Sequence, residues 1–168
     1  ETNASLSRLM IGSEPPPLKH EARAPGEVVL QVQGLSVPKL DPFGVDLRDI
    51  GFEVRAGEIV GVAGVSGNGQ QELMAVLSGE DRRAPAGSIR LFGQDIADHS
   101  PRHRRHEGLH FVPEERLGRG AVPTLSLAQN TLLTRTETVS ASGWINVNAV
   151  SLMAANLISR FNVRAGGA

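Results

Sequence analysis

The chain has 168 residues, enough for one domain of ordinary size, and its 40% apolar and 21% charged residues exclude disorder over most of the length. With 17 basic and 18 acidic residues the net charge is −1, so no overall field attracts nucleic acid. Cysteine is absent, which excludes disulfides and thiolate metal sites, and the longest apolar run, Ile59 to Val65, falls far short of the roughly 18 to 20 residues that span a bilayer.

The first 26 residues combine a short amphipathic stretch with a proline-rich segment. Leu6, Leu9, Met10 and Ile11 form the amphipathic stretch. Four of the ten prolines follow, at positions 15, 16, 17 and 25. Because proline favours an extended backbone, we expect a stiff linker over residues 13–26.

Two antiparallel strands are predicted next. Apolar and polar residues alternate over residues 28–33, which is typical of a strand with one buried face. Residues 47–55 show the same alternation, with Ile50, Phe52 and Val54 on one face.

A strand, a glycine loop and a helix are predicted over residues 59–79. Ile59–Ala63 is a continuous apolar run, which is typical of a strand covered on both faces. From Gln70 the apolar residues recur with a spacing near 3.6, which predicts a helix that ends at Gly79.

Five further elements follow from periodicity and boundary residues. They are a short strand over residues 88–92, a helix over 99–106 with Ser100 as N-cap and Pro101 in its first turn, a buried strand over 109–112, a helix from Ser126 to Leu133, and a last helix that begins at Asn146 or Asn148.

The glycine loop is the segment with the clearest chemical meaning. Its residues are Gly64, Val65, Ser66, Gly67, Asn68, Gly69, Gln70 and Gln71. Backbone N–H groups in such a loop form an anion-binding concavity, and the positive end of the following helix points to the same place. Gln70 and Gln71 stand where a P-loop has its lysine and its hydroxyl, so the charge-assisted phosphate contact is lost. A phosphate site and a glycine-rich turn without a ligand fit this pattern equally well.

Two motifs carry a family resemblance. The segment from Gly57 to Leu73 resembles the second ATP-binding half of ABC importers for simple sugars and nucleosides, in which a degenerate loop is usual. Residues 111–120 (FVPEERLGRG) and 125–130 (LSLAQN) are similar to the Q-loop region of that family, with its "P-E-D-R…G" and "S-x-x-E-N" pattern. The resemblance places Glu114 at the Q-loop position, where a solvated turn charge is the alternative interpretation.

The resemblance implies an α/β fold of the P-loop NTPase (ABC ATPase) class. It implies a half-domain with an antiparallel β-subdomain and part of the helical subdomain. Residues 1–12 are then the tail of a preceding nucleotide-binding domain, 13–26 the linker, and 27–168 the N-terminal part of a second one. We expect the signature, Walker B and switch histidine to follow Arg164, so that the chain is a piece truncated before them.

The resemblance also implies a function in transport. The chain is then part of the ATP-binding component of an importer that energises uptake of a simple sugar or nucleoside, at the cytoplasmic face of the cell membrane. Its implied ligands are ATP and Mg²⁺, with weak or absent binding by the isolated chain. Its implied partners are the first nucleotide-binding domain of the same subunit, the membrane permease subunits and, indirectly, a solute-binding protein, but no nucleic acid.

Catalysis is expected of the intact subunit only. No residue of this chain is assigned a catalytic or metal-binding role, and we expect the isolated chain not to hydrolyse ATP. The alternative is a non-catalytic docking half-domain that contacts the permease without nucleotide. A GTPase is disfavoured, because the chain lacks both the loop lysine and an N-K-x-D motif.

Three other features have structural interpretations. The segment from His99 to His110 carries four histidines among arginines, and their spacing favours a solvated basic helix over a zinc site or a nucleic-acid patch. Trp144 is predicted to be a packing anchor before the last helix. A stacking contact to adenine near Phe43 has no support from the pattern.

Overall fold

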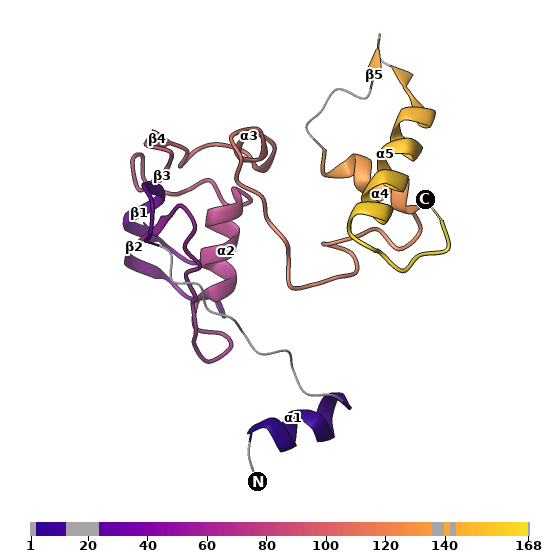
Figure 1. The fold of residues 1–168 in the computed structure, drawn as a ribbon. Helices are drawn as coiled ribbons and strands as arrows, with labels where there is room; N and C mark the ends of the chain where they lie inside the picture. The colour runs from indigo at the N-terminus through magenta and orange to yellow at the C-terminus, as the bar shows by residue number, and fades with distance from the viewer. Residues whose placement is uncertain (1–2, 13–23, 136–139, 142–143, 168) are drawn as a thin grey trace.

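The computed structural model describes residues 3–12, 24–135, 140–141 and 144–167. The proline-rich segment that was predicted as a linker lies almost wholly outside these residues. The elements in chain order are α1 (Asn3–Ile11), β1 (Val28–Val37), β2 (Leu47–Arg55), α2 (Gln70–Ser78), β3 (Ile89–Leu91), β4 (Gln94–Asp95), α3 (Pro101–His106), α4 (Leu127–Leu133), β5 (Ser140–Ala141), β6 (Trp144–Ile145) and α5 (Val147–Arg160) (Figure 1).

The main sheet has four strands in the order β2-β1-β3-β4, and each neighbouring pair is antiparallel. In the centre of the sheet, Val32 of β1 pairs with Phe52 of β2 and with Ile89 of β3. The alternation predicted both long strands, and the bounds of β2 match the expected residues 47–55. The antiparallel β-subdomain is therefore confirmed.

Helix α2 lies against this sheet, and the two share the main hydrophobic core (Figure 1). The 3.6 spacing turns Leu73 and Val76 towards the strands, where both are buried. The buried members of this core are Val32, Leu35, Val37, Leu47, Leu73, Val76, Ile89, Leu91 and Ile96. Helix α2 ends at Gly79, which is left-handed with φ +85° and serves as its C-cap.

Helices α4 and α5 form a separate pair, away from the sheet (Figure 1). Its core is small and consists of Ala128, Val150 and Ala154, with Leu132 packed against them. Helix α5 begins after Asn146, whose side chain accepts a hydrogen bond from the backbone N–H of Ala149 at 3.0 Å. Of the two predicted caps, Asn146 is thus the one used.

Two predicted buried strands are wrong. Ile59–Ala63 is not assigned to a strand, and Ile59 is 97% exposed. Residues 109–112 are also irregular, and Val112 is exposed. Within the described ranges, no backbone–backbone hydrogen bond joins residues 59–65 to another segment. A run of apolar residues becomes a strand only where a neighbouring strand pairs with it, and neither run has one there.

The predicted role of Trp144 is also wrong. Trp144 lies in β6, which pairs with β5, and is 83% exposed rather than packed. No helix in the described part of the chain is long and apolar enough to cross a membrane.

Candidate functional site

The glycine loop leads directly into helix α2. Gly67 and Gly69 have φ angles of +85° and +98°, a backbone region that favours glycine. Gly69 is the N-cap of α2 and provides no side-chain cap to the first turn. The backbone N–H groups of that turn therefore remain available, at the end of the helix where its dipole is positive.

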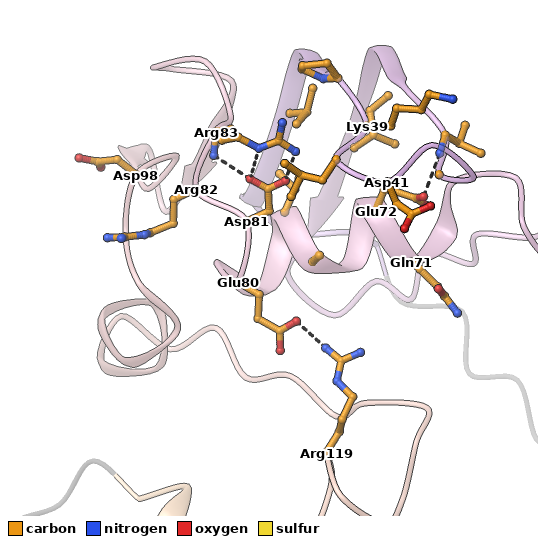
Figure 2. Close-up of a pocket in the computed structure, with 18 residues that line it drawn as sticks. Lys39, Asp41, Gln71, Glu72, Glu80, Asp81, Arg82, Arg83, Asp98 and Arg119 are labelled. Atoms are coloured by element: carbon orange, nitrogen blue, oxygen red, sulfur yellow. Dashed lines mark hydrogen bonds and ion pairs between the residues drawn. The ribbon is translucent and has the colours of Figure 1, made fainter.

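The side chain of Gln70 folds back into the loop. Its Oε1 accepts a hydrogen bond from the backbone N–H of Asn68 at 3.0 Å, and its Nε2 donates one to the carbonyl oxygen of Val65 at 3.0 Å. Gly64 faces the same amide, because a Cβ placed on it would lie 2.8 Å from Nε2. Gln71 is exposed and points away from α2 (Figure 2).

The connection between β1 and β2 supports the start of α2. Glu72 Oε1 accepts a hydrogen bond from the backbone N–H of Val45 at 2.9 Å. A Cβ on Gly69 would lie 3.4 Å from Val45 Cγ1, so this connection packs closely beneath the end of the loop. Phe43, in the same connection, is 96% exposed.

The two parts of the predicted site meet in one cleft. Gln70 and Gln71 line a cleft of about 270 Å³ together with Glu114, which comes from the connection between α3 and α4. Met74, Phe111, Val112 and Pro113 give the cleft an apolar wall. The structure thus brings Glu114 to the same cleft as the two glutamines that follow the glycine loop.

A larger cleft of about 850 Å³ lies beside α2 and carries charges of both signs (Figure 2). Arg83 pairs with Asp81 at 2.6 Å, and this hydrogen bond is the main reason that the pKa of Asp81 is below its ordinary value. Arg119 pairs with Glu80. Arg119 lines both clefts and lies on the same connection as Glu114. Its ion pair with Glu80 therefore ties that connection to the C-terminal end of α2.

Sequence reasoning missed Arg104. The prediction of a solvated basic helix is wrong for this residue, which is 1% exposed. Its Nη1 donates to the carbonyl oxygens of Val76 at 2.6 Å and Leu77 at 2.8 Å. Its Nη2 donates to Ala97 O at 2.9 Å, and its Nε to His99 O at 3.0 Å.

The buried guanidinium closes the C-terminal end of α2 and joins it to the start of α3. Burial lowers the pKa of Arg104 below its ordinary value, and the carboxylates of Glu107 and Asp98 oppose that shift. Gly79 leaves the room that Arg104 needs, since a Cβ there would lie 3.0 Å from Nε. No signal in the sequence separates Arg104 from the other basic residues around it.

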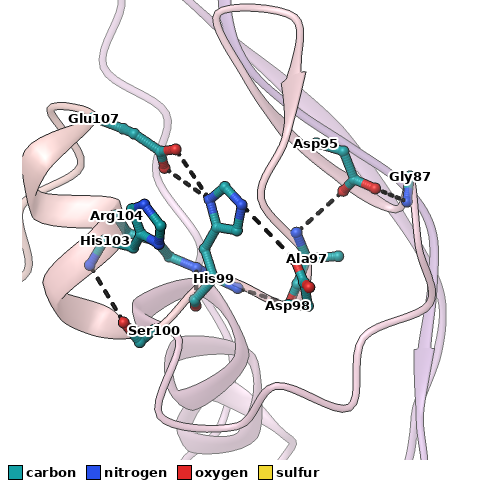
Figure 3. Close-up of polar contacts among 9 residues, drawn as sticks. All are labelled: Gly87, Asp95, Ala97, Asp98, His99, Ser100, His103, Arg104 and Glu107. Carbon is teal, nitrogen blue, oxygen red and sulfur yellow. Dashed lines mark hydrogen bonds and ion pairs between the residues drawn. The ribbon is translucent and has the colours of Figure 1, made fainter.

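The histidines around α3 make contacts of other kinds. His99 Nδ1 lies 3.0 Å from Glu107 Oε1, and the rings of His99 and His103 stack with centroids 4.7 Å apart (Figure 3). His106 and His110 are exposed. In the part of the chain that the structure describes, no group of His, Asp and Glu side chains has the arrangement of a metal site.

The segment LSLAQN forms the start of helix α4. Ser126 accepts a hydrogen bond from the backbone N–H of Gln129 at 3.2 Å, and Gln129 Oε1 accepts one from the backbone N–H of Ser126 at 2.9 Å. This is a capping box, in which glutamine serves as well as glutamate. Asn130 Oδ1 accepts from the N–H of Val122 at 2.8 Å, and its Nδ2 lies 3.1 Å from Val122 O and Leu125 O, so it fixes the preceding loop.

Comparison with known proteins gives one family and several relatives. Residues 47–164 match the family described as ABC transporter. The chain is 34% identical to a nucleoside import ATP-binding protein of Lactococcus lactis subsp. cremoris, over 99% of the chain and 33% of the relative. It is 37% identical to a guanosine import ATP-binding protein of Bacillus subtilis, over 95% and 31%. It is 35% identical to a ribose import ATP-binding protein of Chromobacterium violaceum, over 94% and 30%. The chain thus spans about a third of the length of these curated relatives.

Proposed function

The chain belongs to the ABC transporter family, and from this premise we propose that it is part of the ATP-binding subunit of an importer for a simple sugar or a nucleoside. The names of its relatives support this substrate class, because they are import ATP-binding proteins for nucleosides, guanosine and ribose. Within the chain, we propose residues 64–71 as the nucleotide site, with Glu114 as its Q-loop residue.

One observation supports this proposal above the others: Gln70, Gln71 and Glu114 line the same cleft. The phosphates of ATP would be held by the backbone N–H groups of the loop and by the uncapped first turn of α2. Glu114 would offer a carboxylate oxygen to a Mg²⁺ ion that arrives with the nucleotide, since oxygen is the ligand that Mg²⁺ prefers. The bound ion would neutralise part of the phosphate charge.

The neutral side chain of Gln70 limits what this site does. Because no lysine stands in the loop, the site lacks a charge-assisted hydrogen bond to phosphate, a contact worth about 1.5–3 kcal/mol. We therefore propose that the site binds ATP weakly and does not hydrolyse it in the isolated chain. ATP hydrolysis would belong to the assembled subunit.

The arrangement of the whole subunit is part of the same proposal. Residues 1–12 would end a preceding nucleotide-binding domain, 13–26 would link the two, and 27–168 would begin the second. The first nucleotide-binding domain and the permease subunits would be direct partners, with a solute-binding protein as an indirect one. The subunit would act at the cytoplasmic face of the membrane, without nucleic acid.

The second candidate function is a docking half-domain that binds no nucleotide. Exposed apolar side chains on the helical pair favour it, because such side chains on a surface often mark a contact with another protein. Leu152 of α5 and Phe161, just after its end, are both exposed, as is Trp144.

Titration with ATP and Mg²⁺ distinguishes the two candidates. We expect saturable binding by the full chain, and its loss in Gly67→Asp, where a carboxylate would stand in the phosphate loop. Gly93→Asp is the matched control: both glycines have positive φ, at +85° and +79°, and open space around the Cβ position. It should bind ATP like the wild type. Absence of binding by the wild type, or equal binding by Gly67→Asp, would favour the docking function.

A phosphate-release assay tests the second half of the proposal. The isolated chain should release no phosphate from ATP above the background of the Gly67→Asp protein. Release that persists through repeated purification of the wild type and disappears in Gly67→Asp would contradict an inactive site.

A further inference from the structure

The amide of Gln70 uses both of its polar atoms on the loop backbone. Oε1 accepts from Asn68 N–H and Nε2 donates to Val65 O, each at 3.0 Å. The side chain therefore bridges the loop from one side to the other. The bridge uses one of the loop's own N–H donors, at Asn68, which lies between the two left-handed glycines, Gly67 and Gly69.

That donor is one that an anion in the loop would need. A backbone N–H group has a single proton, so Asn68 cannot make a full hydrogen bond to Gln70 and to a phosphate oxygen at the same time. The Oε1 atom carries partial negative charge and occupies the acceptor position on that N–H. We propose that the Gln70 side chain is an internal occupant of the anion site, which a nucleoside triphosphate must displace in order to bind.

Gly64 supports this position of the Gln70 side chain independently of the two hydrogen bonds. A Cβ on Gly64 would lie 2.8 Å from Gln70 Nε2, closer than real Cβ atoms approach a neighbour. The φ angle of Gly64 is not in the left-handed region, so space for the amide, and not the backbone conformation, calls for glycine here. Gly61, three residues earlier, has open space around its Cβ position.

The consequence is a loop that is already ordered before a ligand arrives. The affinity measured for ATP then includes the cost of breaking two neutral hydrogen bonds. The multiply charged phosphates of a triphosphate make stronger, charge-assisted bonds in exchange, so displacement favours such a ligand over a neutral one. This inference rests on the proposed nucleotide site, and its test therefore has one readout that needs no nucleotide.

The first readout is the hydrogen-exchange rate of the Asn68 amide, measured by NMR on the full chain without ligand. Gln70→Ala removes the acceptor and Gly64→Ala expels the amide, so each should speed exchange at Asn68 by about tenfold, as expected for the loss of one net hydrogen bond. Gln71→Ala and Gly61→Ala are the matched controls and should leave this rate unchanged. Equal rates in the wild type and Gln70→Ala would overturn the inference.

The second readout is ATP affinity in the presence of Mg²⁺. Gln70→Ala should bind ATP more tightly than the wild type, by about tenfold, because no side chain remains to be displaced. Weaker or unchanged binding by Gln70→Ala would overturn the inference and leave the proposed nucleotide site standing. If neither protein binds ATP, the proposed function is overturned. The proposed competition between Gln70 and phosphate is then overturned too, even if Gln70 slows hydrogen exchange at the Asn68 amide.

Discussion

Two parts of the molecule are held together in different ways. One is the sheet with helices α2 and α3, and the other is the pair of helices α4 and α5. The sheet part buries nine apolar side chains in one core and adds a buried arginine that joins two of its helices. The helical pair buries Ala128, Val150 and Ala154, and two of these three side chains are single methyl groups. Because hydrophobic stabilisation grows with the apolar area buried, the pair depends far more on the hydrogen bonds at its helix ends.

This difference bears on the candidate site. The glycine loop continues into α2, which belongs to the part with the larger core. Glu114 lies on the connection that leads from that part towards the helical pair. Arg119 ties this connection to Glu80, at the end of α2, through an exposed ion pair, which contributes little to stability. One side of the site is therefore firmly held and the other is held by weak contacts.

The largest expected effect is at Arg104, and it tests how much the buried arginine stabilises the sheet part. Arg104→Met removes four hydrogen-bond donations and leaves the carbonyl oxygens of Leu77, Ala97 and His99 without this donor, so we expect a loss of about 4 kcal/mol in the free energy of unfolding of the sheet part. Urea unfolding measures it. Arg102→Met, at an exposed position of the same helix, should change the free energy by less than about 0.5 kcal/mol. A similar small loss in both variants would show that the buried arginine does not stabilise this part.

An intermediate effect is expected at Asn130, and it tests whether the two parts unfold separately. Asn130→Ala leaves the N–H of Val122 without its acceptor and frees the loop before α4, at a cost of about 2 kcal/mol. Hydrogen exchange should speed up in α4 and α5 and remain unchanged in β1 and β3. Asn156→Ala, at an exposed position of α5, is the control. Faster exchange throughout the sheet would mean that the two parts unfold as one unit, contrary to the comparison.

The smallest effect is expected at Asp81, which pairs with Arg83 beside α2. The pKa of Asp81 is lowered in the folded state, so the pair stabilises the fold above the ordinary pKa of an aspartate, and this stabilisation is lost as the pH falls through the lower folded pKa. Asp81→Asn should therefore be less stable than the wild type at pH 6, by less than about 1 kcal/mol because Arg83 is partly exposed.

At pH values below the folded pKa the difference between wild type and Asp81→Asn should vanish. Asp49→Asn, at an exposed position of β2, serves as the control at both pH values. A difference that stays constant from pH 6 into the acid range would mean that ionisation of Asp81 does not cause it.

The elements that the sequence predicts well are those whose pattern is local. Alternation predicts β2, the 3.6 spacing with Gly79 predicts α2, and the spacing of Ser100 and Ser126 from the following residues predicts where α3 and α4 begin. Ile59–Ala63 and residues 109–112 were predicted wrongly because an apolar run indicates a tendency to be buried but does not supply the strand that must pair with it. The packing role predicted for Trp144 is wrong for a similar reason, because its apolar ring does not supply the surface that would have to cover it.

Two different signals in the sequence lead to the residues of the candidate site. The glycine spacing indicates the loop, and only the family resemblance indicates Glu114, which the structure then places in the same cleft as Gln70. The inward fold of Gln70 was not predictable, because it depends on one rotamer and on the missing Cβ of Gly64. The burial of Arg104 depends on where the end of α2 lies in the fold, and its basic neighbours suggest solvent instead.

Helix α2 is fastened more firmly at its last turn than at its first, where Glu72 accepts one hydrogen bond from the backbone of Val45. Arg104 occupies the carbonyl oxygens of Val76 and Leu77, while Gly69 provides no side chain to the first turn. The amplitude of thermal motion should therefore increase from the last turn of the helix to its first. The first turn can then adjust to whatever enters the loop, because the clamped end keeps its register with the sheet.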